Sequence, residues 1–323
     1  MNQIMDTIVL TSSRISTNGF IRGAVASCVF LILNFVMFIV YSDDGGMAIR
    51  MCCVLSGVWS LLFGAYTFYN LKTRPGPRLP PGKTYASIGI NSLRDTFKTR
   101  KELPELFTYM LALFIFSDGA STMTAVAALF AAIELNMKFD KVLVGLLICM
   151  FGCVISCLVW FQVERRLGVS QKMVLVSNLT VMMLISIYGI VAFTCQWEFF
   201  LVCLLFGLNY GSYISYTRSI YATNIPTGHE AQFFSLFEVT DKGTSWAGPL
   251  LVGIVFSMTG NFRDAFYVLI AFFAVGIAIL LRFNPENAQR ECKTFELKER
   301  NVGKGDNAGI TMEPKGSKVV PES

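Results

Sequence analysis

The sequence predicts an all-α polytopic membrane protein, and three observations carry that prediction. Hydrophobic residues make up 54% of the 323 positions, and charged residues only 15%, whereas soluble globular proteins have about 25% charged residues. The mean hydropathy is +0.55. The chain also holds eight apolar stretches of about 20 residues, the length of helix that crosses the hydrocarbon core of a bilayer. They lie at about 20–40, 47–69, 105–133, 142–161, 173–193, 197–217, 234–257 and 264–283.

These stretches divide the chain into four expected regions. Residues 1–69 form a partial N-terminal bundle of two spans, and 104–283 form a C-terminal bundle of six. Between them, 70–103 is a basic cytoplasmic linker rich in proline and glycine. Residues 284–323 mix charge with glycine and proline and have almost no aromatic residues, which predicts a disordered cytoplasmic tail.

Basic residues in the loops predict the orientation. With eight spans, all the strongly basic loops fall on one face, so the positive-inside rule puts both termini in the cytoplasm. The net charge of +5 then reflects topology in the lipid bilayer, and no nucleic-acid partner is expected. The basic positions are Arg14, Lys72, Arg74, Arg78, Lys83, Arg94, Lys98, Arg100, Lys101, Arg165, Arg166, Lys172, Arg218, Arg290, Lys293, Lys298, Arg300 and Lys304.

Six spans that end in a cytoplasmic tail match one half of a major-facilitator transporter, whose two six-span halves are joined by a long loop. The first half then lacks four spans. Two interpretations follow: an N-terminally truncated transporter, or a protein that works as something else.

An enzyme or a metal protein is not expected. Cys149, Cys153 and Cys157 share one helical face, but a metal site would need thiolates in hydrocarbon, and the single histidine, His229, is far away in sequence. Small residues that let helices approach closely explain this face better. No catalytic triad or phosphate-binding glycine loop is visible, and no cofactor is expected.

Asp118 is the first candidate for the solute path, because it lies near the middle of its span and a charge at that depth must face a cavity or a partner. It could accept a proton or a substrate ammonium group. A polar contact with Ser117, Ser121 or Thr122 is the structural alternative.

The sixth span adds polar residues to this path. Asn209, Tyr210 and Tyr213 could line it, since tyrosine rings supply contact area and hydroxyls supply orientation. Gly207 and Gly211 have the small-xxx-small spacing of a close helix contact.

The seventh span carries charges near its cytoplasmic mouth. Glu238 and Lys242 have the spacing of a helical ion pair, with Asp241 three residues from Glu238. Pro249 should kink the helix beyond them. Together with Arg218, these charges are interpreted as a cytoplasmic gate, the alternative being a structural bridge to a neighbouring span.

Several motifs, spread over residues 14 to 283, resemble the autophagy-related vacuole effluxer family, a branch of the major-facilitator superfamily. They are Ser16-Thr17-Asn18-Gly19-Phe20 with Gly23, Phe116-Ser117-Asp118-Gly119 with Thr122, Phe233-Phe234-Ser235-Leu236-Phe237, Asp241 to Pro249, and Thr259-Gly260-Asn261 with Arg263. The loop Glu164-Arg165-Arg166-Leu167-Gly168 is similar to a degenerate form of the superfamily's gating motif.

The resemblance implies twelve spans, of which this chain holds the fifth to the twelfth. It also implies a vacuolar, lysosome-like membrane and the export of amino acids released by autophagic degradation. Alternating access by uniport or by proton coupling would serve that function. The alternatives from other classes are an exporter of another small solute and a truncated membrane scaffold that transports nothing.

Overall fold

The computed structural model of the chain describes residues 19, 22–23, 25–41, 45–71, 89, 94, 96–193, 195–243 and 245–309. Most of the expected linker, residues 16–18 and 20 of the first family motif, and 310–323 of the tail lie outside these residues. Within them, six helices are long and apolar enough to cross a membrane, and no strand is present. The expected all-α membrane architecture is confirmed, although six such helices are fewer than eight.

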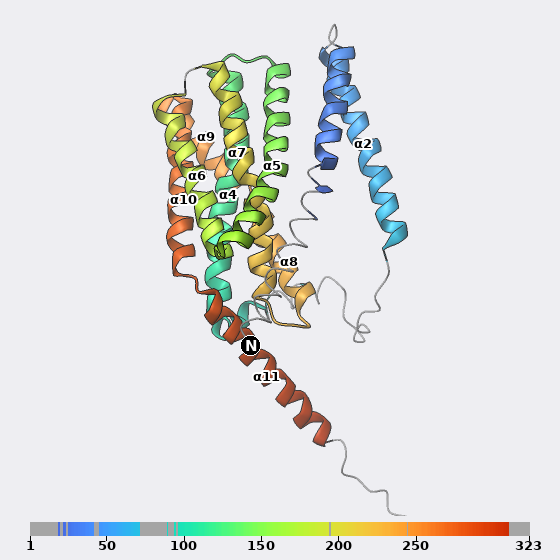
Figure 1. The fold of residues 1–323 in the computed structure, drawn as a ribbon, viewed down its shortest axis with the longest axis vertical. Helices are drawn as coiled ribbons and strands as arrows, with labels where there is room; N and C mark the ends of the chain where they lie inside the picture. Colours follow the sequence, from blue (N-terminus) through green and yellow to red (C-terminus); the bar gives the residue numbers. More distant parts are fainter. Residues whose placement is uncertain are drawn as a thin grey trace, which may run out of the picture.

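The C-terminal bundle consists of upright helices, with α11 extending from one end (Figure 1). We call this the α11 end, and the opposite end the far end. The helices are α4 (Pro104–Ile133), α5 (Phe139–Leu167), α6 (Gln171–Val191), α7 (Gln196–Thr223), α8 (Glu230–Lys242), α9 (Ala247–Thr259), α10 (Ala265–Arg282) and α11 (Pro285–Gly309). Short 3-10 turns lie at η1 (Thr99–Lys101) and η2 (Phe262–Asp264).

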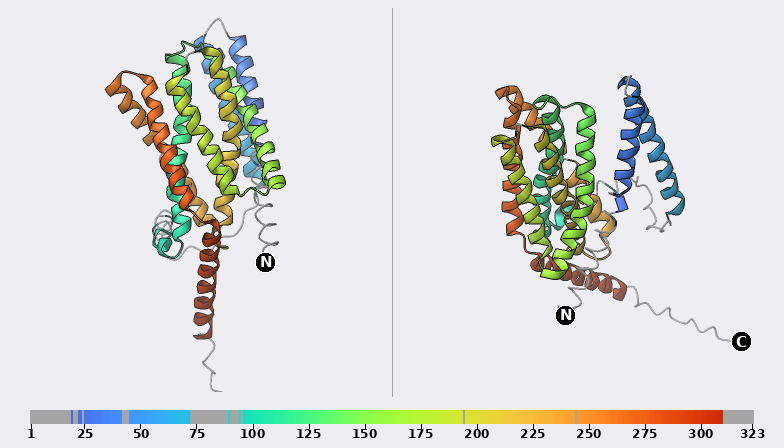
Figure 2. Two further views of the ribbon diagram at one scale, coloured as in Figure 1. Left: turned by 60° about the vertical axis from the view of Figure 1, so that its left-hand side comes forward. Right: turned by 45° about the horizontal axis from the view of Figure 1, so that its top comes forward.

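Two helices precede the bundle. The apolar helix Val25–Val40 is too short to count among the six, and α2 (Gly45–Asn70) pairs with it through the rings of Phe30 and Trp59, whose centroids are 5.4 Å apart. The pair stands apart from the bundle (Figure 2), so only 6% of the most apolar stretch of α2 is buried.

The expected seventh span is not one kinked helix. It is two helices, α8 and α9, which are interrupted around 243–246. Pro249 lies in the first turn of α9, where a missing amide hydrogen leaves no intrahelical bond unmade. The break therefore comes a few residues before the proline rather than at it, because proline disfavours helix in the turn that precedes it.

The expectation of a disordered segment from residue 284 is wrong for α11. Ala288, Cys292 and Phe295 are spaced to lie on one face of this helix, and all three are buried. The Cys292 thiol donates to the Asn224 carbonyl oxygen over 3.0 Å, and Glu296 accepts from the Thr227 amide over 2.8 Å. The helix is thus held against the α11 end of the bundle.

Close helix contacts depend on small residues. A Cβ atom on Gly207 or Gly211 of α7 would collide with the carbonyl oxygen of Cys149 or Cys153 of α5. The small-xxx-small spacing of α7 is therefore confirmed as a close backbone contact, and the buried cysteines of α5 pack there. Among the described residues, no cluster of metal-binding side chains occurs.

Candidate functional site

A polar pocket of about 130 Å³ lies between α4, α7 and α8. We call it the central pocket. It brings together five of the residues singled out in the sequence, namely Tyr210, Tyr213, Arg218, Asp241 and Lys242, together with Ser117, Ser121, Thr217 and Ser245.

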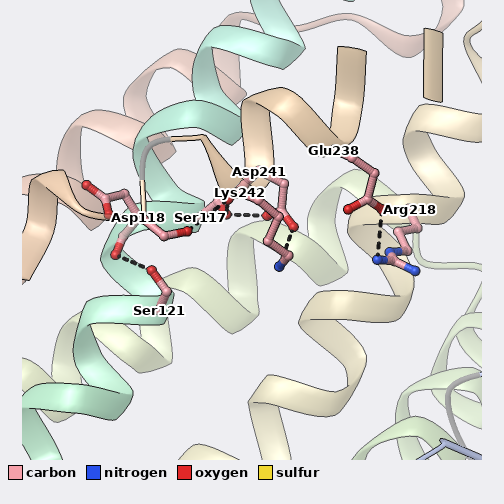
Figure 3. Close-up of polar contacts among 8 residues, drawn as sticks. Ser117, Asp118, Ser121, Arg218, Glu238, Asp241 and Lys242 are labelled. Atoms are coloured by element: carbon pink, nitrogen blue, oxygen red, sulfur yellow. Dashed lines mark hydrogen bonds and ion pairs between the residues drawn. The ribbon is translucent and has the colours of Figure 1, made fainter. Parts of the chain in front are cut away.

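Asp241 is the best-connected charge of the central pocket. Its carboxylate accepts a hydrogen bond from the hydroxyl of Ser117 and pairs with the Lys242 ammonium over 2.8 Å (Figure 3). Only 15% of the Asp241 side chain is exposed, whereas 69% of the Lys242 side chain is. Lys242 also lies in the last turn of α8, where the negative end of the helix dipole favours a cation.

The Asp241 carboxylate lies deeper than the sequence suggested. Ser117 is close to the midpoint of α4, so its bond to Asp241 places that carboxylate near mid-depth and not at the mouth of the helix. The expected ion pair between Glu238 and Lys242 is not present among the described residues. Glu238 instead pairs with Arg218 of α7 over 3.1 Å, and Lys242 pairs with Asp241. Half of each of those two side chains is exposed.

Asp118 lies beside the central pocket and faces a different element. Among the residues that the structure describes, its fully buried Oδ1 atom has no hydrogen-bond partner, and neither has the hydroxyl oxygen of Thr122 one turn along. Both atoms face Gly248 in the first turn of α9, since a Cβ on Gly248 would overlap Thr122 and come 3.1 Å from Asp118 Oδ1. Ser121 donates to the main-chain oxygen of Asp118 rather than to its carboxylate.

This arrangement explains how a carboxylate can be placed there. A helix N-terminus has unpaired amide groups and a partial positive charge, which favour a nearby anion. The break between α8 and α9 creates such an N-terminus inside the bundle, next to Asp118 (Figure 3). Without the break, Asp118 would face a continuous helix whose amides were already paired.

The tyrosines form the apolar wall of the central pocket. The rings of Tyr210 and Tyr213 stack with centroids 5.7 Å apart, and the ring of Phe116 meets Tyr213 edge to face at 5.8 Å. Asn209 does not line the pocket. Its amide donates to the Leu205 carbonyl in its own helix over 2.7 Å.

Sequence reasoning missed Ser117 and Ser245 as lining residues of this pocket. The sequence named Ser117 only as a possible contact of Asp118, and nothing in it linked Ser117 to an acid 124 positions away.

The loop that resembles a gating motif holds a second polar group, at the α11 end. Glu164 is buried and accepts from the hydroxyl of Tyr216 over 2.7 Å and from the Gln171 amide over 3.1 Å. Gln171 in turn accepts from Ser219 over 3.2 Å. These bonds tie α5, α6 and α7 together. Tyr216 is therefore packed inside the bundle.

Comparison with known proteins identifies the family. The family model described as "Vacuole effluxer Atg22 like" matches residues 3–293. The chain belongs to this family. It is 30% identical over 315 residues to Autophagy-related protein 22 of Yarrowia lipolytica, with 89% of this chain and 53% of the relative covered. It is 33% identical over 313 residues to Autophagy-related protein 22 of Cryptococcus neoformans, covering 90% of this chain and 56% of the relative.

A third comparison gives the same proportions. Autophagy-related protein 22-1 of Aspergillus niger is 28% identical over 309 residues, and these cover 90% of this chain and 50% of the relative. The chain thus spans about half the length of the curated relatives it matches. This member of the Atg22-like family is a multi-pass membrane protein.

Proposed function

We propose that this chain forms the solute-binding part of a vacuolar membrane transporter, which exports amino acids released by autophagic degradation to the cytoplasm by alternating access. The family description, a vacuole effluxer, supports transport out of the vacuole. The basic loops support an orientation with the α11 end and both termini in the cytoplasm.

The central pocket carries the proposal, because it holds a lysine and a carboxylate side by side. A free amino acid is a zwitterion, so it needs a cation for its carboxylate and an acceptor for its ammonium group. Lys242 and Asp241 supply both, and they are paired with each other over 2.8 Å. Binding would exchange this internal ion pair for two pairs with the solute. The exchange leaves no charge without a partner.

The walls indicate which side chains the solute carries. Tyr210 and Tyr213 offer stacked rings opposite the charges, which favours neutral or apolar amino acids. The pocket of about 130 Å³ is smaller than the roughly 300–1,000 Å³ of typical ligand sites. A pocket of this size favours a small solute.

Asp118 supplies the second carboxylate at this depth. It is proposed as the proton acceptor or as a further acceptor for the substrate ammonium group. Protonation would remove the negative charge of Asp118 and so weaken its attraction to the α9 N-terminus. The break between α8 and α9 would then allow α9 to move relative to α8. Uniport and proton coupling then differ in one measurement: a proton-coupled exporter loses its response to a pH gradient in the Asp118→Asn variant.

The test is leucine binding to the purified chain in nanodiscs, followed by scintillation proximity with tritiated leucine. Lys242→Gln removes one charged partner of the solute and should weaken binding by about 10- to 100-fold, since a hydrogen bond to a charged group contributes about 1.5–3 kcal/mol. Lys141→Gln is the matched control, because this exposed lysine bonds Gln196 near the far end. Equal affinities in the two variants would contradict the assignment.

Flux through proteoliposomes separates the remaining functions. Leucine efflux that Lys242→Gln abolishes and Lys141→Gln leaves intact supports the exporter. An exporter of another solute predicts neither leucine binding nor leucine efflux, but efflux of its own substrate from the same proteoliposomes. A scaffold without transport predicts neither binding nor flux for any amino acid.

A further inference from the structure

A second cavity lies on the outer side of α8. It has a volume of about 710 Å³ and runs between η1, the first three turns of α4 and the second half of α8. We call it the side groove. Its walls include Phe97, Phe107, Leu111, Phe114 and Val239, and Arg100 lies at its rim.

The groove is apolar and open. Phe97, Leu111, Phe114 and Val239 are each about half exposed, with exposed fractions from 45% to 57%. Lipid-facing apolar residues occur on every membrane bundle and are not informative singly. A concave apolar surface of this volume falls within the range of sites that bind discrete ligands.

The length of the groove corresponds to one leaflet. Along α4 it extends from Pro104 to Phe114, and a helix rises 1.5 Å per residue, so the apolar wall is about 15 Å long. The hydrocarbon core of a bilayer is about 30 Å thick. A single acyl chain lying along the groove would therefore reach from the interface to the bilayer centre.

Positive charge is concentrated at the end of the groove nearest the interface. Lys98, Arg100 and Lys101 are exposed and consecutive or nearly so. The neighbouring acids are engaged by α11: Glu102 pairs with Lys298 over 3.4 Å, and Glu105 accepts from the Asn284 amide over 2.9 Å. Among the residues that the structure describes, no acid pairs with Arg100. An arginine can bind a phosphate with two parallel hydrogen bonds.

We propose that the side groove binds one acyl chain of an anionic phospholipid, with the lipid phosphate on Arg100. The apolar wall takes the chain, and the basic residues select the headgroup, since each lysine or arginine near an anionic surface contributes about 1 kcal/mol. This site is separate from the central pocket and does not depend on which solute is transported.

The two sites share α8 as a common wall. Leu236, Val239 and Gly243 face the side groove, while Phe237 and Asp241 face the central pocket. A bound acyl chain would press α8 against α7 immediately before the break that precedes α9. Lipid binding should therefore fill the groove and also slow the opening of the backbone hydrogen bonds in the second half of α8.

The experiment uses the full chain in detergent, titrated with dioctanoyl phosphatidylserine or dioctanoyl phosphatidylcholine and followed by native mass spectrometry. The wild-type protein should retain one phosphatidylserine at least tenfold more tightly than phosphatidylcholine. Arg100→Gln should weaken phosphatidylserine binding by about tenfold or more, because it removes the charged hydrogen bond to the lipid phosphate, and such a bond contributes about 1.5–3 kcal/mol.

A second variant tests the groove itself. Leu111→Trp fills the apolar wall and should remove the tightly bound lipid of either kind. Leu129→Trp is its control, because Leu129 is a similarly exposed residue of the same helix toward the far end, outside the groove. Thermal unfolding of all variants verifies that they remain folded. In hydrogen–deuterium exchange, phosphatidylserine should protect 236–243 in the wild type and in Leu129→Trp, but not in Leu111→Trp.

The opposite results would overturn the proposal. If Arg100→Gln binds phosphatidylserine as tightly as the wild type does, or if Leu111→Trp binds lipid as the wild type does, the retained lipid is bulk lipid around the bundle. If the protein is a dimer whose groove peptides are protected without lipid, a second copy of the chain is the occupant.

Discussion

Gly248 gives the sharpest test of how the broken helix is seated. It is buried in the first turn of α9, against α4. In a Gly248→Ala variant, the new methyl group would overlap the Thr122 hydroxyl, lie 2.9 Å from the Thr122 Cβ and lie 3.1 Å from Asp118 Oδ1. Thr122 is fully buried, so it cannot swing into solvent, and α9 has to move away from α4.

Two opposing free-energy contributions determine how much Gly248→Ala should change the free energy of unfolding. Overpacking a well-packed interior costs about 1–3 kcal/mol, whereas replacing a helical glycine by alanine gains about 0.5–1 kcal/mol. Gly253→Ala in the same helix is the matched control, because a Cβ there meets nothing within 4 Å. The helix-propensity gain is common to both variants, so their difference in unfolding free energy should equal the overpacking cost, about 1–3 kcal/mol.

Thermal unfolding in detergent, followed by circular dichroism, measures this difference. We expect Gly248→Ala to melt about 2–12 °C below Gly253→Ala, since 1 kcal/mol shifts the melting temperature of a protein of this size by about 2–4 °C. Adding Thr122→Gly removes the colliding atoms and should narrow the gap in a double-mutant cycle. Equal melting temperatures for the two alanine variants, with no coupling to Thr122, would refute the contact between α9 and α4.

Three further predictions concern the helix contacts and the tail. Gly207→Ala should destabilise the detergent-solubilised protein by about 1–3 kcal/mol relative to the control Gly57→Ala. A Cβ on Gly207 would collide with a backbone oxygen, whereas a Cβ on Gly57 meets nothing within 4 Å. Equal unfolding free energies of the two variants would exclude the close contact between α5 and α7. Burial raises the pKa of Glu291, so its contribution to the docking of α11 is fully present below its ordinary pKa and is lost as the pH rises through the raised value. Hydrogen-exchange protection of α11 should fall from pH 4 to pH 7, and a Glu291→Gln variant that shows the same fall would contradict this. Burial also raises the pKa of Cys292 to about 12. N-ethylmaleimide at pH 8 should therefore modify the exposed Cys195, which lies between α6 and α7, and spare Cys292, as peptide mass spectrometry can establish.

Much of the fold could be predicted from the sequence, because membrane helices are recognised by length and hydropathy alone. The spans expected at 105–133, 173–193 and 264–283 match α4, α6 and α10 within a few residues at each end. The break of the seventh span was harder to predict. Pro249 indicated a kink in one continuous helix, whereas the chain forms two helices that are interrupted around 243–246, before the proline.

The tail shows a pattern that hydropathy conceals. The overall composition of α11 is polar, which favoured disorder. However, Ala288, Cys292 and Phe295 recur at intervals of four and three residues, the spacing of one helix face. That spacing could have revealed the docked helix.

The contacts of the α8 acids with Arg218 of α7 and Ser117 of α4 could not be predicted, because these partners lie on other helices. Glu238 and Lys242 satisfied the local rule for an ion pair, yet Glu238 pairs with Arg218 of α7 and Lys242 pairs with Asp241. The spacing of residues along one helix predicts which side chains can pair within that helix, but not which side chains of other helices pack against them. The functional roles assigned to these residues stay predictions.

The hydrogen bond between Ser117 and Asp241 also imposes a delay during synthesis, because Ser117 is made well before its partner. The two residues are 124 positions apart. A ribosome that adds 5–20 residues per second needs about 6–25 s between them. During that time the α4 segment must wait in or near the bilayer with Asp118 and Ser117 lacking their native neighbours on α8 and α9. Biogenesis of this bundle therefore has a vulnerable interval, and a protein that shelters polar transmembrane segments during synthesis would act on α4.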